Sequence, residues 1–200
     1  MLTLKQSQKF PWQLIVLAVA VLLLAGGIYM LASTSSPFIA RQFTDPANNA
    51  TTKLIEETKD TINENRLYIP KIDINLPYAA GDENTMLKGA WWRKPENGNP
   101  KDGGNFVLSA HRFVMGWTPG ETVKRSPFYN IDKLAIGDEI TIDYQKERFV
   151  FVIEKTYSVK PDAVEIENRT DDTRLTLYSC TLGGASDGRD VIIAKLRATD

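Results

Sequence analysis

Residues 173–198 read TRLTLYSC, TLGGASDG and RDVIIAKLRA, and these three runs decide the fold. The first and last runs are rich in β-branched and apolar residues, which favour strands, and the middle run is rich in turn residues. Two strands joined by so short a connection pair as antiparallel neighbours. If the loop at 181–188 closes evenly, Cys180 lies directly opposite Arg189. A slip of one residue would send the two side chains to opposite faces of the sheet.

This hairpin would bring a guanidinium close to a thiol. Opposed Cβ atoms in an antiparallel pair are about 5 Å apart. The guanidinium of Arg189 is always protonated and presents its donors in a fixed fork. It can therefore favour the thiolate of Cys180 and can hydrogen-bond a carbonyl oxygen that becomes negative during attack. The alternative is an ordinary arginine at a hairpin end, paired with Asp187 or Asp190.

The strand pattern extends back through most of the sequence from residue 66. Strands are predicted at 66–72, 74–79, 105–110, 139–144, 148–160, 173–180 and 190–198. The segment SPFYNIDKL at 126–134 predicts a short helix, with Ser126 as N-cap and Pro127 at the first helical position. Together these elements predict a mainly β domain, either a barrel or a sandwich, with one or two short helices.

Cys180 and His111 are the only cysteine and histidine in the sequence. A lone cysteine excludes a disulfide within the chain and indicates a free reactive thiol, an intermolecular bridge or a buried small hydrophobe. One histidine and one cysteine do not make a closed zinc site, and thiol redox chemistry would need a second cysteine, so we expect no metal and no cofactor. His111 follows a predicted strand and starts a loop, where catalytic groups are common, although a hydrogen-bonded structural histidine is the other interpretation.

Residues 14–32, LIVLAVAVLLLAGGIYMLA, carry no charge and predict a single transmembrane helix. At about 1.5 Å rise per residue this run is roughly 28 Å long, close to the thickness of a hydrocarbon core. It exceeds the apolar core of a secretory signal, roughly 7–15 residues, so we expect a retained anchor, with cleavage near Ser33 as the alternative. Lys5 and Lys9 precede it, which places residues 1–13 in the cytoplasm as a tail.

The rest of the chain is then expected outside the cell. Residues 33–65 form an extracellular linker or stalk, in which 53–64 is a candidate amphipathic helix. After the anchor there are 22 lysines and arginines against 25 aspartates and glutamates, without a block of like charge. We therefore expect no nucleic-acid partner.

Five segments, taken in order, resemble the sortase family of cysteine transpeptidases. They are YIPKI (68–72) for the opening strand, GNFVLSAHR (104–112) for G-N-x-V-(x)-x-G-H-R, SPFYNIDKL with the following Gly-Asp (126–138) for P-F-x-x-L-x-x-L-x-x-G-D, TLYSC (176–180) for T-L-x-T-C, and RDVIIA (189–194) for R-x-V-x-x-A. The resemblance implies a sortase-like closed β-barrel of about eight strands with one or two short helices, preceded by a single N-terminal transmembrane helix. Residues 66–200 would be the catalytic barrel.

Two positions depart from the family's pattern. Ala110 stands where the family has glycine, which adds a methyl group beside the site. Ser179 stands where the family has threonine, which keeps a hydroxyl group for substrate. Both are candidate substrate-binding residues, and Trp92 is a third, although a tryptophan in such a pair more often belongs to a core.

The resemblance also implies a mechanism. Cys180 would attack the threonine carbonyl of a sorting signal of the Leu-Pro-x-Thr-Gly kind, Arg189 would stabilise the oxyanion, and His111 would protonate the leaving amine. The partners would be surface proteins or pilins that carry the signal, and an amine acceptor such as a cell-wall precursor. The enzyme would be a single-pass protein of the cell membrane with its catalytic domain outside.

Two other functions remain open from the sequence. The first is a cysteine endopeptidase, in which water resolves the same acyl-enzyme. The second is a catalytically silent barrel that only binds peptides. The intact set of Cys180, His111 and Arg189 favours catalysis over silent binding.

Overall fold

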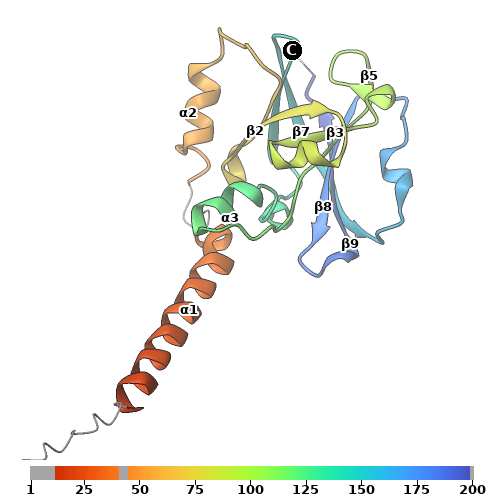
Figure 1. Cartoon of the computed structure of the whole chain (residues 1–200). Coiled ribbons are helices and arrows are strands. Elements are labelled where there is room, and N and C mark those ends of the chain that lie inside the picture. The colour runs from red at the N-terminus through yellow and green to blue at the C-terminus, as the bar shows by residue number, and fades with distance from the viewer. Residues whose placement is uncertain (1–11, 41–44, 199–200) are drawn as a thin grey trace, which may run out of the picture.

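The structure is a computed structural model that describes residues 12–40 and 45–198. Figure 1 shows a β-barrel with a long N-terminal helix projecting from it, and the C-terminal end lies on the far side of the barrel from that helix. The strands are β1 (Arg66–Ile69), β2 (Ile74–Ala80), β3 (Ala90–Arg93), β4 (Gly98–Asn99), β5 (Gly103–Ser109), β6 (Glu139–Tyr144), β7 (Glu147–Val159), β8 (Arg174–Thr181) and β9 (Gly184–Leu196). The helices are α1 (Trp12–Ala40), α2 (Ala50–Glu57) and α3 (Pro119–Arg125), with short 3-10 helices η1 (Pro70–Ile72), η2 (Glu83–Leu87), η3 (Pro95–Asn97), η4 (Ile131–Lys133) and η5 (Val164–Glu167).

Within the described residues, eight strands close into a barrel. The order is β3-β2-β1-β6-β7-β9-β8-β5, and the pairing of β3 with β5 closes the ring. The two-residue strand β4 pairs with β5 outside this ring. The pairs β2–β3 and β5–β8 are parallel, and the other pairs are antiparallel. The predicted closed barrel of about eight strands is therefore confirmed.

Alternate residues of the strands fill the barrel. On β5 and β8 the core side chains are those of Phe106, Leu108, Leu175 and Leu177, which are fully buried. Burying each such side chain stabilises the fold by about 1.5–3 kcal/mol. The intervening residues face outward, and the hydroxyl of Thr176 donates to Asn105 Oδ1 at 2.6 Å on that outer face. The two faces of β5 and β8 are thus clearly separated.

Of the helix predicted at 126–134, only the short 3-10 helix η4 (Ile131–Lys133) forms, and the predicted start at Ser126 is wrong. The helix of this region, α3, ends at Arg125, and Ser126 is its C-cap instead of an N-cap. Thr118 is the N-cap, its hydroxyl accepts from the backbone of Glu121, and a proline follows it at the first helical position. Beyond Ser126 the chain forms turns because Phe128 is fully buried in the core and its N–H donates to the backbone oxygen of His111 at 3.1 Å.

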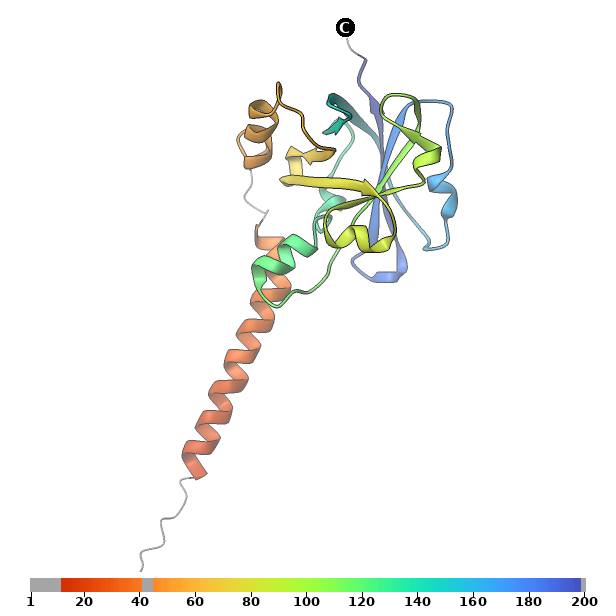
Figure 2. The ribbon, with the colours of Figure 1, turned by 45° about the horizontal axis from the view of Figure 1, so that its top comes forward.

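Helix α1 contains the whole of the predicted membrane span 14–32 and continues to Ala40, so residues 33–40 of the predicted linker are helical. Among the residues that the structure describes, it is the one helix long and apolar enough to cross a membrane. Its last turns pack against the barrel domain, where Ser36 Oγ donates to the backbone oxygen of Pro119 at 3.0 Å. Figures 1 and 2 both show α3 beside this end of α1.

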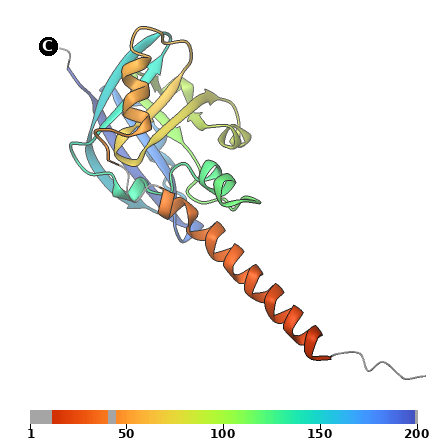
Figure 3. The ribbon, with the colours of Figure 1, turned by 90° about the vertical axis from the view of Figure 1, so that its left-hand side faces the viewer.

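Helix α2 lies against the outside of the barrel near β1, as Figure 3 shows. It begins three residues before the predicted helix at 53–64 and ends at Glu57. Asn49 caps its first turn by accepting from the backbone of Thr52 at 2.9 Å. At its other end, Arg148 joins Asp143 on β6 to the backbone oxygen of Ile55.

Candidate active site

The hairpin of β8 and β9 places Cys180 directly opposite Arg189. The predicted register is therefore confirmed. Immediately beyond this pair the hairpin is irregular, since Thr181 pairs with Gly184 and leaves residues 185–188 of β9 as a bulge. Bulges re-aim side chains at sheet ends, and here the bulge wraps around the arginine.

The neighbouring parallel strand β5 runs in the same direction as β8 and ends two residues before His111. Ser109 on β5 is level with Tyr178 on β8. β5 ends there, and His111 follows it by two residues, as Cys180 follows Tyr178 on β8. Neighbouring strands are about 4.8 Å apart. Cys180 thus has Arg189 opposite it on β9, and its other neighbouring strand, β5, leads into His111.

Arg189 is held by the backbone of its own bulge. Its Nη1 donates to the carbonyl oxygens of Ala185 and Gly188, both at 2.8 Å. It forms no salt bridge within the described residues, and the carboxylates of Asp187 and Asp190 accept from other groups. The surface ion pair considered from the sequence is therefore not formed. The other guanidinium nitrogens remain able to donate to a negative oxygen near Cys180.

The thiol of Cys180 is free and half-buried. His111 is also half-buried, and this desolvation is the main reason that its pKa is lowered from 6.5. The positive charge of Arg125 lowers it further, and the negative charge of Glu83 acts in the opposite direction. Near neutral pH the imidazole is therefore mostly uncharged, which suits a group that must accept a proton and later donate one.

A buried arginine lies behind these three groups. Arg112 is only 3% exposed, and its Nη1 and Nη2 donate to Asp190 at 2.6 Å and to Asp132 at 2.7 Å. Asp190 also accepts from Ser158 at 2.7 Å. Arg112 directly follows His111 and Asp190 directly follows Arg189. The ion pair of Arg112 with Asp190 therefore links the residue after His111 to the residue after Arg189.

A second polar network fixes the segment that covers the outer face of β5 and β8. The carboxylate of Glu167 in η5 receives two hydrogen bonds from Arg93, at 2.6 and 3.0 Å, and one from the hydroxyl of Tyr178. Burial alone would raise the pKa of Glu167, but these hydrogen bonds outweigh it and lower the pKa. Asn105 Nδ2 also donates to backbone oxygens on either side of Glu167, at 2.9 and 2.8 Å.

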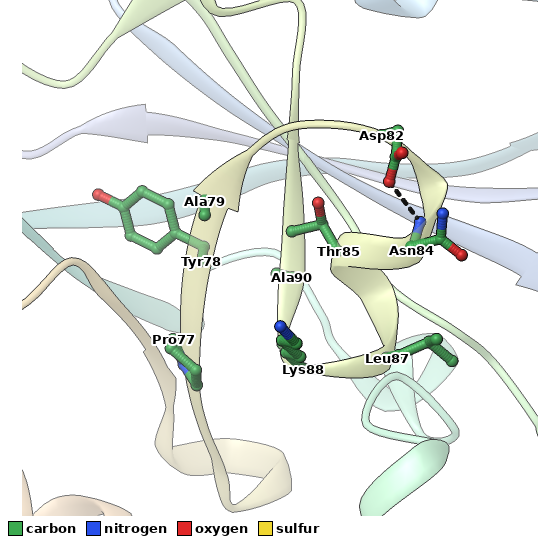
Figure 4. Close-up of a pocket in the computed structure, with 10 residues that line it drawn as sticks. Pro77, Tyr78, Ala79, Asp82, Asn84, Thr85, Leu87, Lys88 and Ala90 are labelled. Atoms are coloured by element: carbon green, nitrogen blue, oxygen red, sulfur yellow. Dashed lines mark hydrogen bonds between the residues drawn. The ribbon is translucent and has the colours of Figure 1, made fainter.

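This arrangement leaves a hollow of about 130 Å³ beside the candidate site. Its lining includes Arg93, Glu167, Tyr178 and Arg189. The hollow therefore opens onto the guanidinium that faces Cys180. A larger apolar groove of about 430 Å³ lies between β2 and η2 (Figure 4), and its ten lining residues include neither His111 nor Cys180.

The three candidate substrate-binding residues lie on the core side of their strands. Ala110 is 2% exposed and belongs to the hydrophobic core, and Ser179 is 1% exposed. Trp92 packs edge-to-face against Tyr78 and Phe106 inside the barrel. Their side chains can shape the site from behind, but the faces that meet the hollow belong to Tyr178 and Arg189.

Sequence reasoning missed Arg112, Glu167 and Tyr178. Tyr178 carried a signal, because alternation places it on the face of Cys180 two residues away. Glu167 gave none, because it sits among exposed charged residues in an irregular segment. Arg112 was quoted only as part of a family pattern, and its burial depends on Asp190, which is 78 residues away.

A closed eight-stranded barrel with a free cysteine paired opposite an arginine at the end of two of its strands defines the class: a β-barrel protein with a cysteine-centred candidate site. Residues 67–197 match the family model described as Sortase domain, and the chain belongs to the sortase family, whose members are cysteine transpeptidases.

Individual relatives support the same family. Sortase A of Streptococcus agalactiae serotype III (strain NEM316) is 29% identical over 132 residues, which are 66% of this chain and 51% of that protein. The chain thus spans about half the length of this relative.

Two solved structures share the fold. Sortase A of Listeria monocytogenes aligns with a TM-score of 0.58 and 21% identity, over 68% of this chain and 88% of that one. Sortase C of Clostridium perfringens with the C-terminal cell wall sorting motif aligns with a TM-score of 0.56 and 24% identity, over 70% of this chain and 75% of that one.

Proposed function

We propose that this chain is a membrane-anchored cysteine transpeptidase that cleaves an LPxTG-like sorting signal and transfers the bound protein to an amine acceptor. The observation that carries the proposal is the register that sets Cys180 opposite Arg189, on a strand whose other neighbour, β5, ends two residues before His111. The family assignment supports the reaction class. The sortase C structure with a cell wall sorting motif supports the substrate class.

The first half-reaction forms a thioester. The thiolate sulfur of Cys180 attacks the carbonyl carbon of the scissile peptide, and the carbonyl oxygen becomes negative. The guanidinium of Arg189 donates to this oxygen, and its position is fixed in advance by the two backbone carbonyls of the bulge. The C–N bond then breaks as protonated His111 gives its proton to the leaving amine.

The second half-reaction reverses the roles. An acceptor amine attacks the thioester carbon, and neutral His111 takes the proton from its nitrogen. The sulfur of Cys180 leaves as the thiolate, and a new amide bond joins the surface protein to the acceptor. The lowered pKa of His111 favours its neutral form in this step.

The substrate would lie at the end of β8, beside the η5 segment that covers the rest of the outer face of β5 and β8. The hollow beside Arg189 can receive a side chain of an extended peptide, with Tyr178 at its base and the η5 segment as its wall. Because Arg93, Glu167 and Asn105 fix that wall, the groove is largely preformed.

Helix α1 supports the membrane attachment. Its exposed apolar side chains from Leu14 to Leu31 have no cover within the described residues. A bilayer would bury them, with the N-terminal tail in the cytoplasm because Lys5 and Lys9 precede the span. The barrel domain would then work at the outer membrane surface.

One experiment separates transfer from the other functions. Mix the full chain with an LPxTG peptide and an excess of a small amine such as triglycine, and weigh the products. Transfer predicts the ligated peptide, whereas water as acceptor gives the hydrolysed peptide only. If neither product nor a mass adduct on Cys180 forms, the barrel is a silent binder and the proposal is overturned.

A further inference from the structure

Three large apolar side chains stand exposed in a row just after His111. Phe113 is 40% exposed, Met115 is 37% exposed and Trp117 is 84% exposed. They alternate with the less exposed Val114 and Gly116, so the segment presents these three side chains to solvent. We call these three residues the apolar ridge. Single exposed apolar residues are ordinary, but a contiguous row of this kind marks an interaction surface.

The ridge is held rigidly in this exposed state. The backbone N–H of Val114 donates at 3.0 Å to the side-chain oxygen of the C-cap residue of α3. The N–H of Gly116 donates at 3.0 Å to a side-chain oxygen in the middle of α3, and the N–H of Trp117 donates at 2.8 Å to one in its first turn. The backbone is thereby tied to α3, and its apolar side chains cannot turn into the barrel core. A fixed apolar row exposed to water is unfavourable unless something covers it.

The ridge is joined to the outer end of the apolar span in α1. The hydroxyl of Tyr29 donates to the backbone oxygen of Trp117 at 2.7 Å. Trp12 and Tyr29 are near the two ends of that span and are separated by about 26 Å of helix, close to the thickness of a hydrocarbon core. Aromatic residues of this kind mark the two membrane interfaces. Trp117 therefore lies at the depth of the outer interface.

The charge around the ridge fits a lipid surface. Lys124 and Arg125 occupy the last turn of α3, and Lys124 is exposed. Basic side chains beside aromatic ones are attracted to the phosphate groups of lipids, while tryptophan prefers the boundary between headgroups and acyl chains. A peptide or a second copy of the chain would have to reach this surface within the headgroup layer.

We propose that the apolar ridge inserts into the outer interface of the same membrane that α1 crosses. This inference rests on the membrane attachment proposed above. Two contacts, one helix and one ridge, would prevent the barrel from tilting on its anchor. Because the ridge begins two residues after His111, the site would be held at a fixed height above the lipid, within reach of substrates that are themselves attached to the membrane.

The test measures depth in the bilayer for single labelled positions. Prepare the full chain with Cys180→Ala and one new cysteine at Phe113, Met115, Val164 or Val21, and label each with an environment-sensitive fluorophore. Reconstitute each protein in phosphatidylcholine–phosphatidylglycerol vesicles that carry nitroxide-labelled lipids. Val164 is the matched control, because it is 72% exposed and apolar but lies in η5, outside the ridge. Val21 reports the anchor.

The expected result is blue-shifted and strongly quenched emission at Phe113 and Met115, with quenching at Val21 and none at Val164. If Val21 is quenched but Phe113 and Met115 are not, the anchor holds and the ridge proposal is wrong. If Val21 is not quenched, the membrane attachment itself fails, and the ridge proposal fails with it. Equal quenching at Val164 would show nonspecific adsorption and would also overturn it.

A variant provides a second readout. Trp117→Ser removes the ridge side chain but keeps the carbonyl oxygen that binds Tyr29, so docking of α1 is retained. Quenching at Met115 should fall in this variant and remain unchanged in Val164→Ser. Unchanged quenching in Trp117→Ser would contradict a role for the ridge in membrane contact.

Discussion

The proton on His111 decides which half of the proposed reaction can proceed. Burial of the imidazole and the nearby charge of Arg125 both disfavour the protonated form. The first half-reaction needs the imidazolium and the second needs the neutral ring. A lowered pKa therefore makes the protonated, thiolate-containing form scarce at neutral pH and favours attack by the acceptor.

We predict that the pKa of His111 lies below 6.5 and that Arg125→Gln raises it. The chain has one histidine, so its C2 proton gives a single assignable NMR signal during a pH titration. In the window between the folded and unfolded pKa values the unfolded chain binds more protons, so stability should rise with pH through that window. A pKa above 6.5, or no change in Arg125→Gln, would contradict this electrostatic account.

Arg112 is a positioning residue, because it acts through its ion pairs. Arg112→Ala should destabilise the fold by about 3 kcal/mol, the low end for breaking a buried pair, because Asp190 is left without its charged partner. It should also lower kcat more than it raises KM, since the backbone beside His111 and Arg189 loses its tie.

Arg112→Lys is the matched variant, and it should recover part of the stability but less of kcat, because an ammonium cannot hold two carboxylates in a fixed fork. Urea unfolding and steady-state kinetics measure the two effects separately. Full kcat in a folded Arg112→Ala variant would show that the network is only structural.

At the scale of elements, the β8–β9 hairpin was predictable and α3 was not. The two strands of the hairpin are close in sequence, so the length of the loop between Cys180 and Arg189 is enough to predict which residues pair. The residue pairs at 118–119 and at 126–127 are both Thr or Ser followed by Pro, and both carry the signal for a helix start. The helix begins after the first pair, because Phe128 in the second segment is buried in the core. The inward side of Trp92 was equally hidden, because β3 has only four residues and shows no alternation.

The η5 segment supplies a prediction about acid stability. The depressed pKa of Glu167 means that its contribution is fully present above the unfolded value of about 4.5 and is lost as pH falls through the folded value. Between neutral and acidic pH, the free energy of unfolding should therefore fall less in Glu167→Gln than in the parent chain.

The neighbouring Glu165→Gln is the control for this prediction, since Glu165 is exposed in the same 3-10 helix. Urea unfolding at a series of pH values compares the two variants with the parent chain. The same acid slope in Glu167→Gln and in the parent would show that the carboxylate does not hold the segment.

At the scale of the whole molecule, closure of the barrel assembles the site. His111 and Cys180 are far apart in sequence, and the parallel pairing of β5 with β8 places the ends of their strands side by side. No local pattern predicts that pairing, which is why the family resemblance and not the spacing first joined them. Closure also keeps the barrel free of unpaired edges near the site.

The most direct test of the central claim is acylation of Cys180 in arginine variants. Arg189→Ala should slow thioester formation by about 100- to 1,000-fold, equivalent to roughly 3–4 kcal/mol, as removal of an oxyanion donor does. Arg189→Lys should recover only part of the rate, because the fork is lost. Arg174 begins β8 and lies about 20 Å along the strand from Cys180, so Arg174→Ala is the control.

Each variant is mixed with an LPxTG peptide without an acceptor, and the adduct on Cys180 is followed by intact mass. The account predicts rapid acylation in Arg174→Ala, slow acylation in Arg189→Ala and none in Cys180→Ala. Acylation at the parent rate in Arg189→Ala, with loss in Arg174→Ala, would contradict the assignment of the oxyanion donor.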